Sequence, residues 1–205
     1  MPTAEFFTRL GLFVRKNFLE QELCAQCCSE MDVAARAQAN PGGLVGPDDT
    51  DIIDETIRKV KWVTVPATTV SLVEARLVAL QPTLERHFNV AFTGFEQPQF
   101  LTYQEGDFFK VHNDGYNIAD AATLAKRRKV SVVIFLNGQA QQPADGTYCG
   151  GSLAFYGLID DPRWLTYGFP LSSEPGLLVA FRSTVLHQVL PVTYGKRYSI
   201  VSWLF

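Results

Sequence analysis

Apolar residues in the first half of the chain recur at helical spacing in two stretches. Residues 19–39 form the first stretch and residues 69–88 the second, and each predicts a helix. The apolar face of the first is made by Leu23, Cys27, Met31 and Ala34. Thr69 or Ser71 is a candidate N-cap of the second helix, and Pro82 is expected to end or kink it.

Short strands and a loop are expected around these helices. Residues 10–18 and 57–65 have the composition of strands, and the breakers of Asn40-Pro41-Gly42-Gly43 are expected to end the first helix. The aspartate-rich residues 44–54 predict a loop. The first half therefore reads as a helix-rich support region.

From about residue 92 the chain consists of short alternating runs separated by glycine, proline, asparagine and aspartate. The runs that predict strands are residues 99–103, 108–112, 130–136, 152–155, 177–181, 187–192 and 197–204. Many short strands with such turn residues are typical of a β-barrel, sandwich or jelly roll. With 205 residues, the chain is expected to form one mainly β domain supported by N-terminal helices.

Composition and charge narrow the partners. The chain is 47% hydrophobic and 19% charged, with a net charge of −3, so nothing favours non-specific binding to nucleic acid or to a membrane. The longest apolar run, Val132 to Leu136, is far too short to span a bilayer. A basic segment followed by an apolar one is missing at the N-terminus, so we expect no secretory signal.

The four cysteines are expected to be buried free thiols. Cys24, Cys27 and Cys28 are too close together for easy disulfides, and no second Cys/His pair completes a zinc site with them. Cys149 stands alone. Free thiols fit a reducing compartment, so the predicted location is cytoplasmic.

Three candidate metal ligands stand out within strand-like sequence. His112 and Asp114 are two positions apart, so both side chains point to the same face of an extended strand, and His187 lies 75 positions after His112. Two histidines and a carboxylate form the facial triad that holds Fe(II) and leaves positions open for a cosubstrate and oxygen. The remaining histidine, His87, is expected at the surface or at a helix end.

A candidate anion site follows the second histidine. Residues 192–197 predict a hairpin turn into the last strand, on which Arg197, Ser199, Val201 and Trp203 share one face. The planar fork of Arg197 can pair with a carboxylate, and Ser199 adds a hydroxyl donor. Lys196 is the competing cation, but it falls in the turn and on the opposite face.

Several spaced segments form a recognisable set: Tyr103, His112-Asn113-Asp114, residues 131–137, Gly150-Gly151-Ser152-Leu153-Ala154-Phe155 and residues 187–199. In this order they resemble the prolyl 4-hydroxylase-like superfamily of Fe(II)/2-oxoglutarate dioxygenases. The resemblance covers roughly residues 98–205 and is specific for the cofactor chemistry. Ser152 departs from the glutamate that many relatives have there, which bears on substrate contacts and not on the metal.

The resemblance implies a fold and a site. Residues 98–205 would form a double-stranded β-helix, a jelly-roll or cupin-like core, with the helices of residues 1–97 packed on one sheet. His112, Asp114 and His187 would bind Fe(II), and Arg197 would pair with the distal carboxylate of 2-oxoglutarate. Tyr103 would reach the same cosubstrate, with Ser199 beside it and Trp203 lining the pocket.

The resemblance also implies an activity. We expect hydroxylation of a C–H bond by O2, with conversion of 2-oxoglutarate to succinate and CO2, and some members need ascorbate. A carboxylate at Asp114 favours hydroxylation over halogenation. A prolyl or other peptidyl side chain is the first candidate substrate, and a free amino acid or small metabolite is the alternative. The alternative without enzymatic activity is a non-catalytic metal-binding β-sandwich.

Two further segments have predicted roles. Residues 115–129 and 138–149 are expected to be loops over the site that carry substrate selectivity. Within the first, the basic run of residues 126–129 predicts a solvated helix end rather than a phosphate site.

Overall fold

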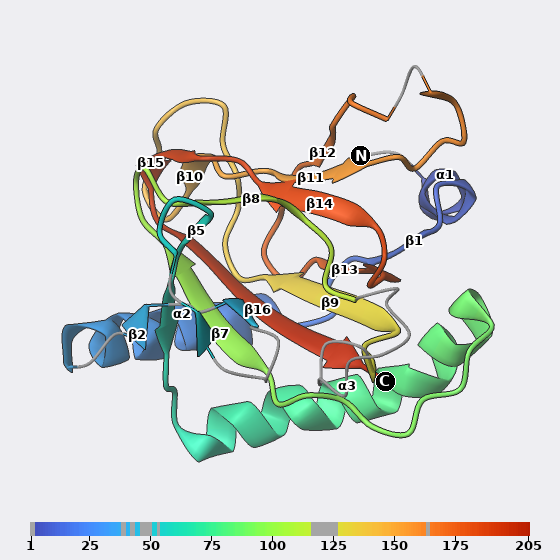
Figure 1. The fold of residues 1–205 in the computed structure, drawn as a ribbon. Coiled ribbons are helices and arrows are strands. Elements are labelled where there is room, and N and C mark those ends of the chain that lie inside the picture. Colours follow the sequence, from blue (N-terminus) through green and yellow to red (C-terminus); the bar gives the residue numbers. More distant parts are fainter. Residues whose placement is uncertain are drawn as a thin grey trace.

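Two antiparallel sheets face each other in the computed structural model (Figure 1), which describes residues 3–37, 40–41, 44–45, 51–52, 54–115, 127–162 and 165–205. The major sheet contains, in spatial order, β1 (Leu12–Arg15), β13 (Leu178–Arg182), β9 (Val130–Phe135), β16 (Arg197–Leu204), β7 (Gln99–Tyr103), β6 (Lys61–Val63) and β2 (Asn40–Pro41). The minor sheet contains β12 (Phe169–Leu171), β11 (Leu153–Tyr156), β14 (Leu186–Val189), β8 (Phe108–His112) and β5 (Arg58–Lys59). Two short pairs join β10 (Tyr148–Gly150) to β15 (Val192–Gly195), and β3 (Leu44–Val45) to β4 (Asp51–Ile52).

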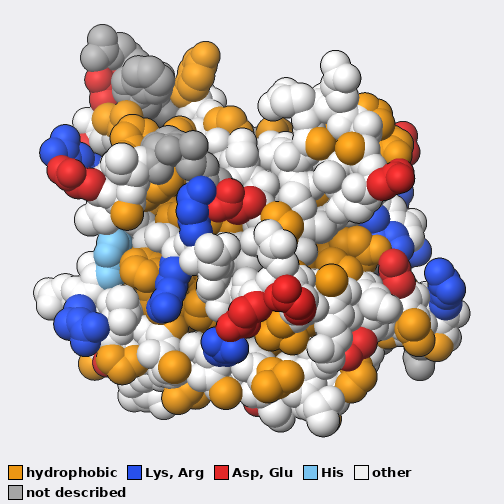
Figure 2. Space-filling view, turned by 180° about the vertical axis from the view of Figure 1, so that it is seen from behind, with side chains coloured by type: hydrophobic (Ala, Val, Ile, Leu, Met, Phe, Trp, Pro, Cys, Tyr) orange, Lys and Arg blue, Asp and Glu red, His pale blue; other side chains and the backbone are white. Residues whose placement is uncertain are grey.

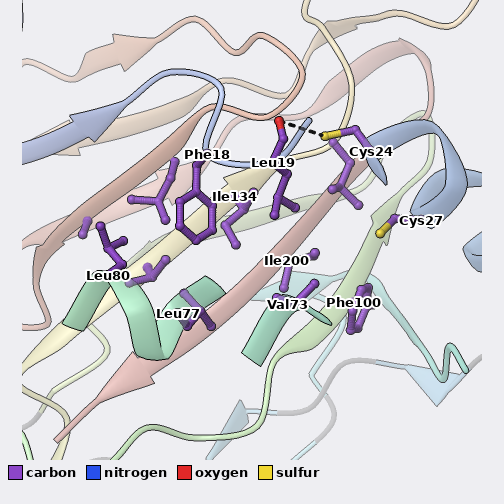
Figure 3. Close-up of a cluster of buried hydrophobic side chains, with 14 of the residues drawn as sticks. Phe18, Leu19, Cys24, Cys27, Val73, Leu77, Leu80, Phe100, Ile134 and Ile200 are labelled. Atoms are coloured by element: carbon purple, nitrogen blue, oxygen red, sulfur yellow. Dashed lines mark hydrogen bonds between the residues drawn. The ribbon is translucent and has the colours of Figure 1, made fainter. Parts of the chain in front are cut away.

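The helices α2 (Gln21–Ala37) and α3 (Ala67–Phe88) cover the outer face of the major sheet (Figure 1). Their apolar faces and the outward side chains of the sheet form one core (Figure 3). Members of this core include Cys27, Met31, Val73, Leu77, Leu80, Phe100, Ile134 and Ile200. All four cysteines are free; Cys24, Cys27 and Cys149 are buried and Cys28 is partly buried, as expected.

A second core fills the space between the two sheets. Alternate residues of β9 point to opposite sides, so Val132 and Ile134 face the helices whereas Val133 and Phe135 face the minor sheet. From the minor sheet, Leu153, Phe155, Leu171 and Val189 complete this inner core. Because both faces are covered, every residue of β9 is buried.

The helices differ from the prediction at their boundaries. α3 begins at Ala67 after Pro66, and the Thr69 hydroxyl donates to Glu30 of α2 instead of capping α3. Pro82 lies inside α3, and the helix continues to Phe88. Of the two outcomes expected at Pro82, an end of the helix is therefore wrong, because the buried apolar face on both sides of the proline outweighs its local cost; a kink there stays a prediction.

One predicted strand divides between the sheets, and one predicted turn contains a strand. The stretch predicted at residues 57–65 forms β5 in the minor sheet and β6 in the major sheet, with buried Val60 between them. The predicted hairpin turn over residues 192–197 is also wrong, because it contains β15, which pairs with β10 and carries the chain between the sheets. Gly195 has a φ of +74°, and a Cβ there would lie 2.6 Å from the Thr147 carbonyl oxygen.

Some short elements were not predicted from the sequence. The sequence pattern did not reveal α1 (Ala4–Arg9), whose N-cap is Thr3, nor β10 or β12. These elements span two turns of helix or three strand residues, too few for a period to emerge. The loop predicted at residues 44–54 is wrong at its two ends, because Leu44–Val45 and Asp51–Ile52 pair as β3 and β4. Residues 46–50 and 53, like residues 116–126, lie outside the described residues.

The surface carries charges of both signs. On the face drawn in Figure 2, Lys and Arg side chains are interspersed with Asp, Glu and hydrophobic side chains. Among the described helices, none is both long and apolar enough to cross a membrane.

Candidate metal centre

Strands β8 and β14 bring the three predicted metal ligands together. His112 and His187 are direct cross-strand partners, and their ring centroids lie 4.2 Å apart. Asp114 follows β8, and its two carboxylate oxygens each lie 3.5 Å from one histidine Nε2. The candidate ligand atoms all lie within 4.8 Å of one another. Two nitrogens and one oxygen thus converge on one small volume.

Backbone carbonyls fix the orientation of both imidazoles. Nδ1 of His112 lies 2.7 Å from the Lys110 carbonyl oxygen, and Nδ1 of His187 lies 2.9 Å from that of Val185. A carbonyl only accepts, so each Nδ1 carries the proton and each Nε2 keeps a free lone pair. This is the tautomer that a metal ligand needs.

A bulge in β8 shapes the wall beside His112. His187 pairs with His112 and Val189 pairs with Phe109, so β8 has one more residue than β14 over this span. Phe109 and His112 therefore both line the pocket, and their rings stack with centroids 3.5 Å apart. The Arg58 guanidinium lies over the Phe109 ring, 4.8 Å from its centroid.

The Asp114 carboxylate is held from the major sheet. Ser131 of β9 donates its hydroxyl to Oδ2 at 2.7 Å, and the backbone N–H groups of Asp114 and Gly115 both donate to the Ser183 carbonyl oxygen at 2.9 Å. A Cβ on Gly115 would lie 3.1 Å from both the Arg128 carbonyl oxygen and Ser183 Cβ. A glycine therefore suits this tight turn.

The pKa values of Asp114 and His187 favour the protonation states that metal ligands need. Burial alone would raise the pKa of Asp114, but His187, His112 and the Ser131 hydroxyl hold it well below its usual range. Burial lowers the pKa of His187 to about 4, against the pull of Asp114. Near pH 7 the carboxylate is ionised and the His187 imidazole is neutral.

Arg197 lies in the same pocket on β16 and is almost completely buried. Its guanidinium donates to the Ser199 hydroxyl at 3.0 Å and lies over the rings of Tyr103 and Phe135. Its Nε has no hydrogen-bond partner, and no carboxylate pairs with it among the described residues. A buried, unpaired cation is costly, so the site is suited to an anion from outside the chain.

The neighbouring cation takes no part in this pocket. Lys196 lies 2.5 Å from the Asp32 carboxylate of α2, which also accepts from the Tyr198 hydroxyl. The opposite-face placement expected for Lys196 agrees with this contact.

Both sheets line the pocket. The predicted face of β16 is present in full, since Arg197, Ser199, Val201 and Trp203 all contribute. Tyr103 comes from the adjacent β7, where it pairs with Arg197. The structure thus brings all seven predicted site residues to one place.

The basic run before β9 has a structural role that the sequence did not suggest. Arg128 forms two hydrogen bonds with the Glu96 carboxylate, at 2.5 and 2.6 Å, and its guanidinium lies 3.8 Å from the centroid of Trp203. Its side chain is only 7% exposed, so the predicted solvated helix end is wrong at Arg128. Lys126 lies outside the described residues.

Several pocket residues were missed. Arg58, Phe109 and Ser131 contact the site, yet each lies in a run that reads as ordinary strand. Only the β8 bulge and the facing sheets place them there. Residues 138–149, expected over the site, contribute none of the described side chains that line the pocket; Tyr148 is buried against Ser173.

Comparison with known protein families identifies the matching half of the chain. The model of the 2OG-Fe(II) oxygenase superfamily matches residues 98–205. A PKHD-type hydroxylase of Shewanella sp. (strain ANA-3) is 37% identical over 111 residues, covering 54% of this chain and 43% of the relative. One from Paraburkholderia phytofirmans is 35% identical over 108 residues, 52% of this chain and 41% of the relative. The chain thus spans less than half the length of these curated relatives.

Solved structures match nearly the whole chain. A Pseudomonas putida prolyl-4-hydroxylase has a TM-score of 0.67 and 27% identity, covering 95% of this chain and 91% of that one. A Trichoplax adhaerens prolyl hydroxylase, solved with a hypoxia inducible factor peptide fragment, has a TM-score of 0.72 and 19% identity, covering 98% and 86%. The second likeness concerns the fold alone. Together they confirm the predicted double-stranded β-helix with helical support.

Proposed function

Because the chain belongs to the 2OG-Fe(II) oxygenase superfamily, we propose that it is a dioxygenase that hydroxylates a C–H bond. The family uses Fe(II), 2-oxoglutarate and O2, and the products from the cosubstrate would be succinate and CO2. The observation that carries the proposal is one pocket that holds both a His–Asp–His cluster and a buried arginine, which has no carboxylate partner within the described part of the chain. Fe(II) needs the ligand cluster, and the carboxylate of 2-oxoglutarate needs a cation such as the arginine.

The residues present fit the metal and its cosubstrate. His112 and His187 would offer Nε2, and Asp114 would offer a carboxylate oxygen, which is the donor set that suits Fe(II). Arg197 would bind the distal carboxylate of 2-oxoglutarate, and its unpartnered Nε supports this role. When bound, the iron and 2-oxoglutarate supply the oxidising chemistry.

The remaining side chains orient the cosubstrate and exclude water. Ser199 accepts from Arg197, so its own hydroxyl proton is available to the bound anion. The Tyr103 ring lies 4.9 Å from the Arg197 guanidinium, which puts its hydroxyl in the same region of the pocket. Val201 and Trp203 give the pocket an apolar wall. A need for ascorbate stays a prediction, as does a cytoplasmic location.

An anaerobic absorption titration tests the cofactor assignment. Wild-type protein is titrated with Fe(II) and then with 2-oxoglutarate, beside Asp114→Ala, Arg197→Ala and the control Lys196→Ala. We expect a metal-to-ligand charge-transfer band in the wild type and in the control. The band should be lost in Asp114→Ala and should need roughly 100-fold more 2-oxoglutarate in Arg197→Ala, because removing one partner of a buried charge pair costs about 3 kcal/mol.

The outcome separates an enzyme from a binding module. Lys196 is the adjacent cation but faces α2, so its removal controls for a general loss of positive charge. Absence of the band in the wild type, with or without bound iron, would reject the oxygenase proposal and favour a non-catalytic metal-binding β-sandwich.

For the substrate we propose a prolyl or other peptidyl side chain. Support comes from the 27% identity to the Pseudomonas putida prolyl-4-hydroxylase over nearly the full length of both chains. The alternative is a free amino acid or small metabolite. Succinate formation is measured with proline-containing peptides, with matched peptides in which alanine replaces proline, and with free amino acids. Succinate formation with the free amino acids alone would overturn the peptidyl assignment.

A further inference from the structure

We infer that Ser131 positions the Asp114 carboxylate so that Oδ1, and not Oδ2, is presented to the metal. This inference rests on the proposed function. Asp114 Oδ1 and Oδ2 each lie 3.5 Å from one histidine Nε2, so the ligand cluster alone does not distinguish them. The Ser131 hydroxyl does, because it donates to Oδ2 at 2.7 Å.

Counting protons fixes the direction of the hydrogen-bond chain. The Ser131 hydroxyl has one proton, and an ionised carboxylate can only accept, so that proton is directed at Asp114. The Ser131 oxygen lies 3.0 Å from the Ser183 oxygen and must accept there. The chain therefore runs from Ser183 to Ser131 to Asp114. Each hydrogen bond in such a chain polarises and strengthens the next.

Ser183 also holds the backbone of the same residue. Its carbonyl oxygen accepts from the N–H groups of Asp114 and Gly115, so the two serines fix Asp114 at both its main chain and its side chain. Ser183 and Ser131 are both buried and lie at the ends of neighbouring strands, β13 and β9. The turn that bears Asp114 is thereby attached to the facing sheet.

Ser131 belongs to a row of side chains that crosses the major sheet. Its cross-strand partners are Phe181 on β13 and Trp203 on β16. Phe181 packs edge-on against His187, with ring centroids 4.7 Å apart, and Trp203 lines the pocket. This row of three side chains on β13, β9 and β16 thus contacts His187 through Phe181 and Asp114 through Ser131, and it lines the pocket through Trp203. This gives Ser131 a rigid base from which to orient Asp114.

The consequence is a carboxylate that binds through one oxygen. With Oδ2 engaged by Ser131, Asp114 occupies one coordination position and leaves the others to the two histidines and to exchangeable ligands. Partners that orient a metal ligand typically contribute 10- to 100-fold to metal affinity. Ser131 would therefore act as a positioning residue, without contact to substrate or cosubstrate.

The test uses Co(II) as an oxygen-insensitive probe of the chain of residues 1–205. Co(II) affinity is measured by calorimetry and the ligand field by visible absorption, for wild type, Ser131→Ala, Ser131→Thr, Ser183→Ala and Ser202→Ala. Ser202 is a matched control: it is equally buried, on the adjacent strand, and donates to the Glu96 carbonyl oxygen away from the ligands. Thermal unfolding of the metal-free proteins reports any general loss of structure.

We expect Ser131→Ala to bind Co(II) about 10-fold more weakly and to shift the absorption bands. Ser131→Thr should restore both because it keeps the hydroxyl, Ser183→Ala should lie between, and Ser202→Ala should match the wild type. Wild-type affinity and bands in Ser131→Ala would overturn the inference while leaving the proposed function intact. If Ser131→Ala does not fold, unchanged bands in Ser183→Ala would overturn it instead. A wild type that binds neither Co(II) nor Fe(II) would reject both.

Discussion

Both histidines of the candidate metal centre donate Nδ1–H to the carbonyl oxygen two residues before them. Asp114 uses Oδ2 for Ser131, and Arg197 uses one terminal nitrogen for Ser199. What is left over is the two Nε2 lone pairs and Asp114 Oδ1, which face one another, and Arg197 Nε, which has no hydrogen-bond partner among the described residues. At the residue scale, the hydrogen bonds within the protein determine which polar atoms of the site remain available to a metal or an anion.

The thiols of α2 show the opposite situation, in which burial suppresses reactivity. Burial against the major sheet raises the pKa of Cys24 to about 11 and the pKa of Cys27 to about 12. An unfolded thiol ionises near pH 9, so above this pH the unfolded state loses protons that the folded state keeps. The stability from these thiols is therefore complete below pH 9 and is lost as the pH rises through 11 to 12.

Replacing one thiol should reduce this pH dependence. Between about pH 8 and pH 10, Cys27 is expected to lower the free energy of unfolding by about 1 kcal/mol. Cys27→Ala should be less stable than the wild type at pH 8, because it leaves a small cavity, but should lose less stability on going to pH 10. Urea unfolding at both pH values measures, for each protein, how much the free energy of unfolding falls between pH 8 and pH 10. An equal fall in the wild type and in Cys27→Ala would contradict a raised Cys27 pKa.

The chemical identity of the site could be predicted from sequence, but its supports could not. His112 and Asp114 are neighbours in sequence, and the spacing of two already places them on one face. Arg128 pairs with Glu96 and stacks on Trp203, residues that are remote in sequence. The basic run around Arg128 gave no sign of either partner. Contacts of this kind exist only after the sheets have formed.

At the scale of elements, strands with a clear period of two were predicted well. β7, β8 and β16 have the predicted bounds. In β7 and β16, successive side chains alternate between the two cores over five residues or more, whereas β8 is bounded by turn residues on both sides. The division of residues 57–65 into β5 and β6 was not foreseen, since no local signal says which sheet a residue joins. The bulge in β8 was missed for the same reason.

One connection between elements depends on a glycine. Gly176 precedes β13 with a φ of +76°; its carbonyl accepts from Phe18 N–H, and its own N–H donates to Phe135. A Cβ at this position would lie 2.1 Å from the Leu19 carbonyl oxygen. Here the segment leading into α2 approaches the sheet more closely than any side chain would allow.

Gly176→Ala should therefore be strongly destabilising, and Gly11→Ala provides the matched control. Gly11 has a φ of +74° but nothing within 4 Å of an added Cβ. The control should lose about 1 kcal/mol for the left-handed backbone alone, whereas Gly176→Ala should lose more than about 3 kcal/mol. Chemical denaturation of both variants gives the comparison. Similar losses would mean that the backbone beside Leu19 can move aside.

At the scale of the whole molecule, the two halves of the chain contribute strands to both sheets. The family model covers residues 98–205, which include every candidate metal ligand. The first half adds β1 and β6 to the major sheet, Arg58 to the pocket, and α2 and α3 to the outer face. This sharing supports the prediction of one domain over residues 1–205, which stays a prediction.

A fragment of residues 98–205 should consequently fail to fold alone. It would expose the outward apolar side chains of the major sheet, including Phe100, Val132, Ile134, Leu178 and Ile200. Burial of each such side chain contributes roughly 1.5–3 kcal/mol, so their exposure removes about 10 kcal/mol, which equals the whole stability of a typical domain. Near-ultraviolet circular dichroism and urea unfolding of the fragment, with and without a separate 1–97 fragment, measure this. We expect no cooperative transition from residues 98–205 alone and at least partial recovery on mixing. Cooperative unfolding of residues 98–205 alone would mean that the double-stranded β-helix is an independent domain and that the helices are dispensable for its stability.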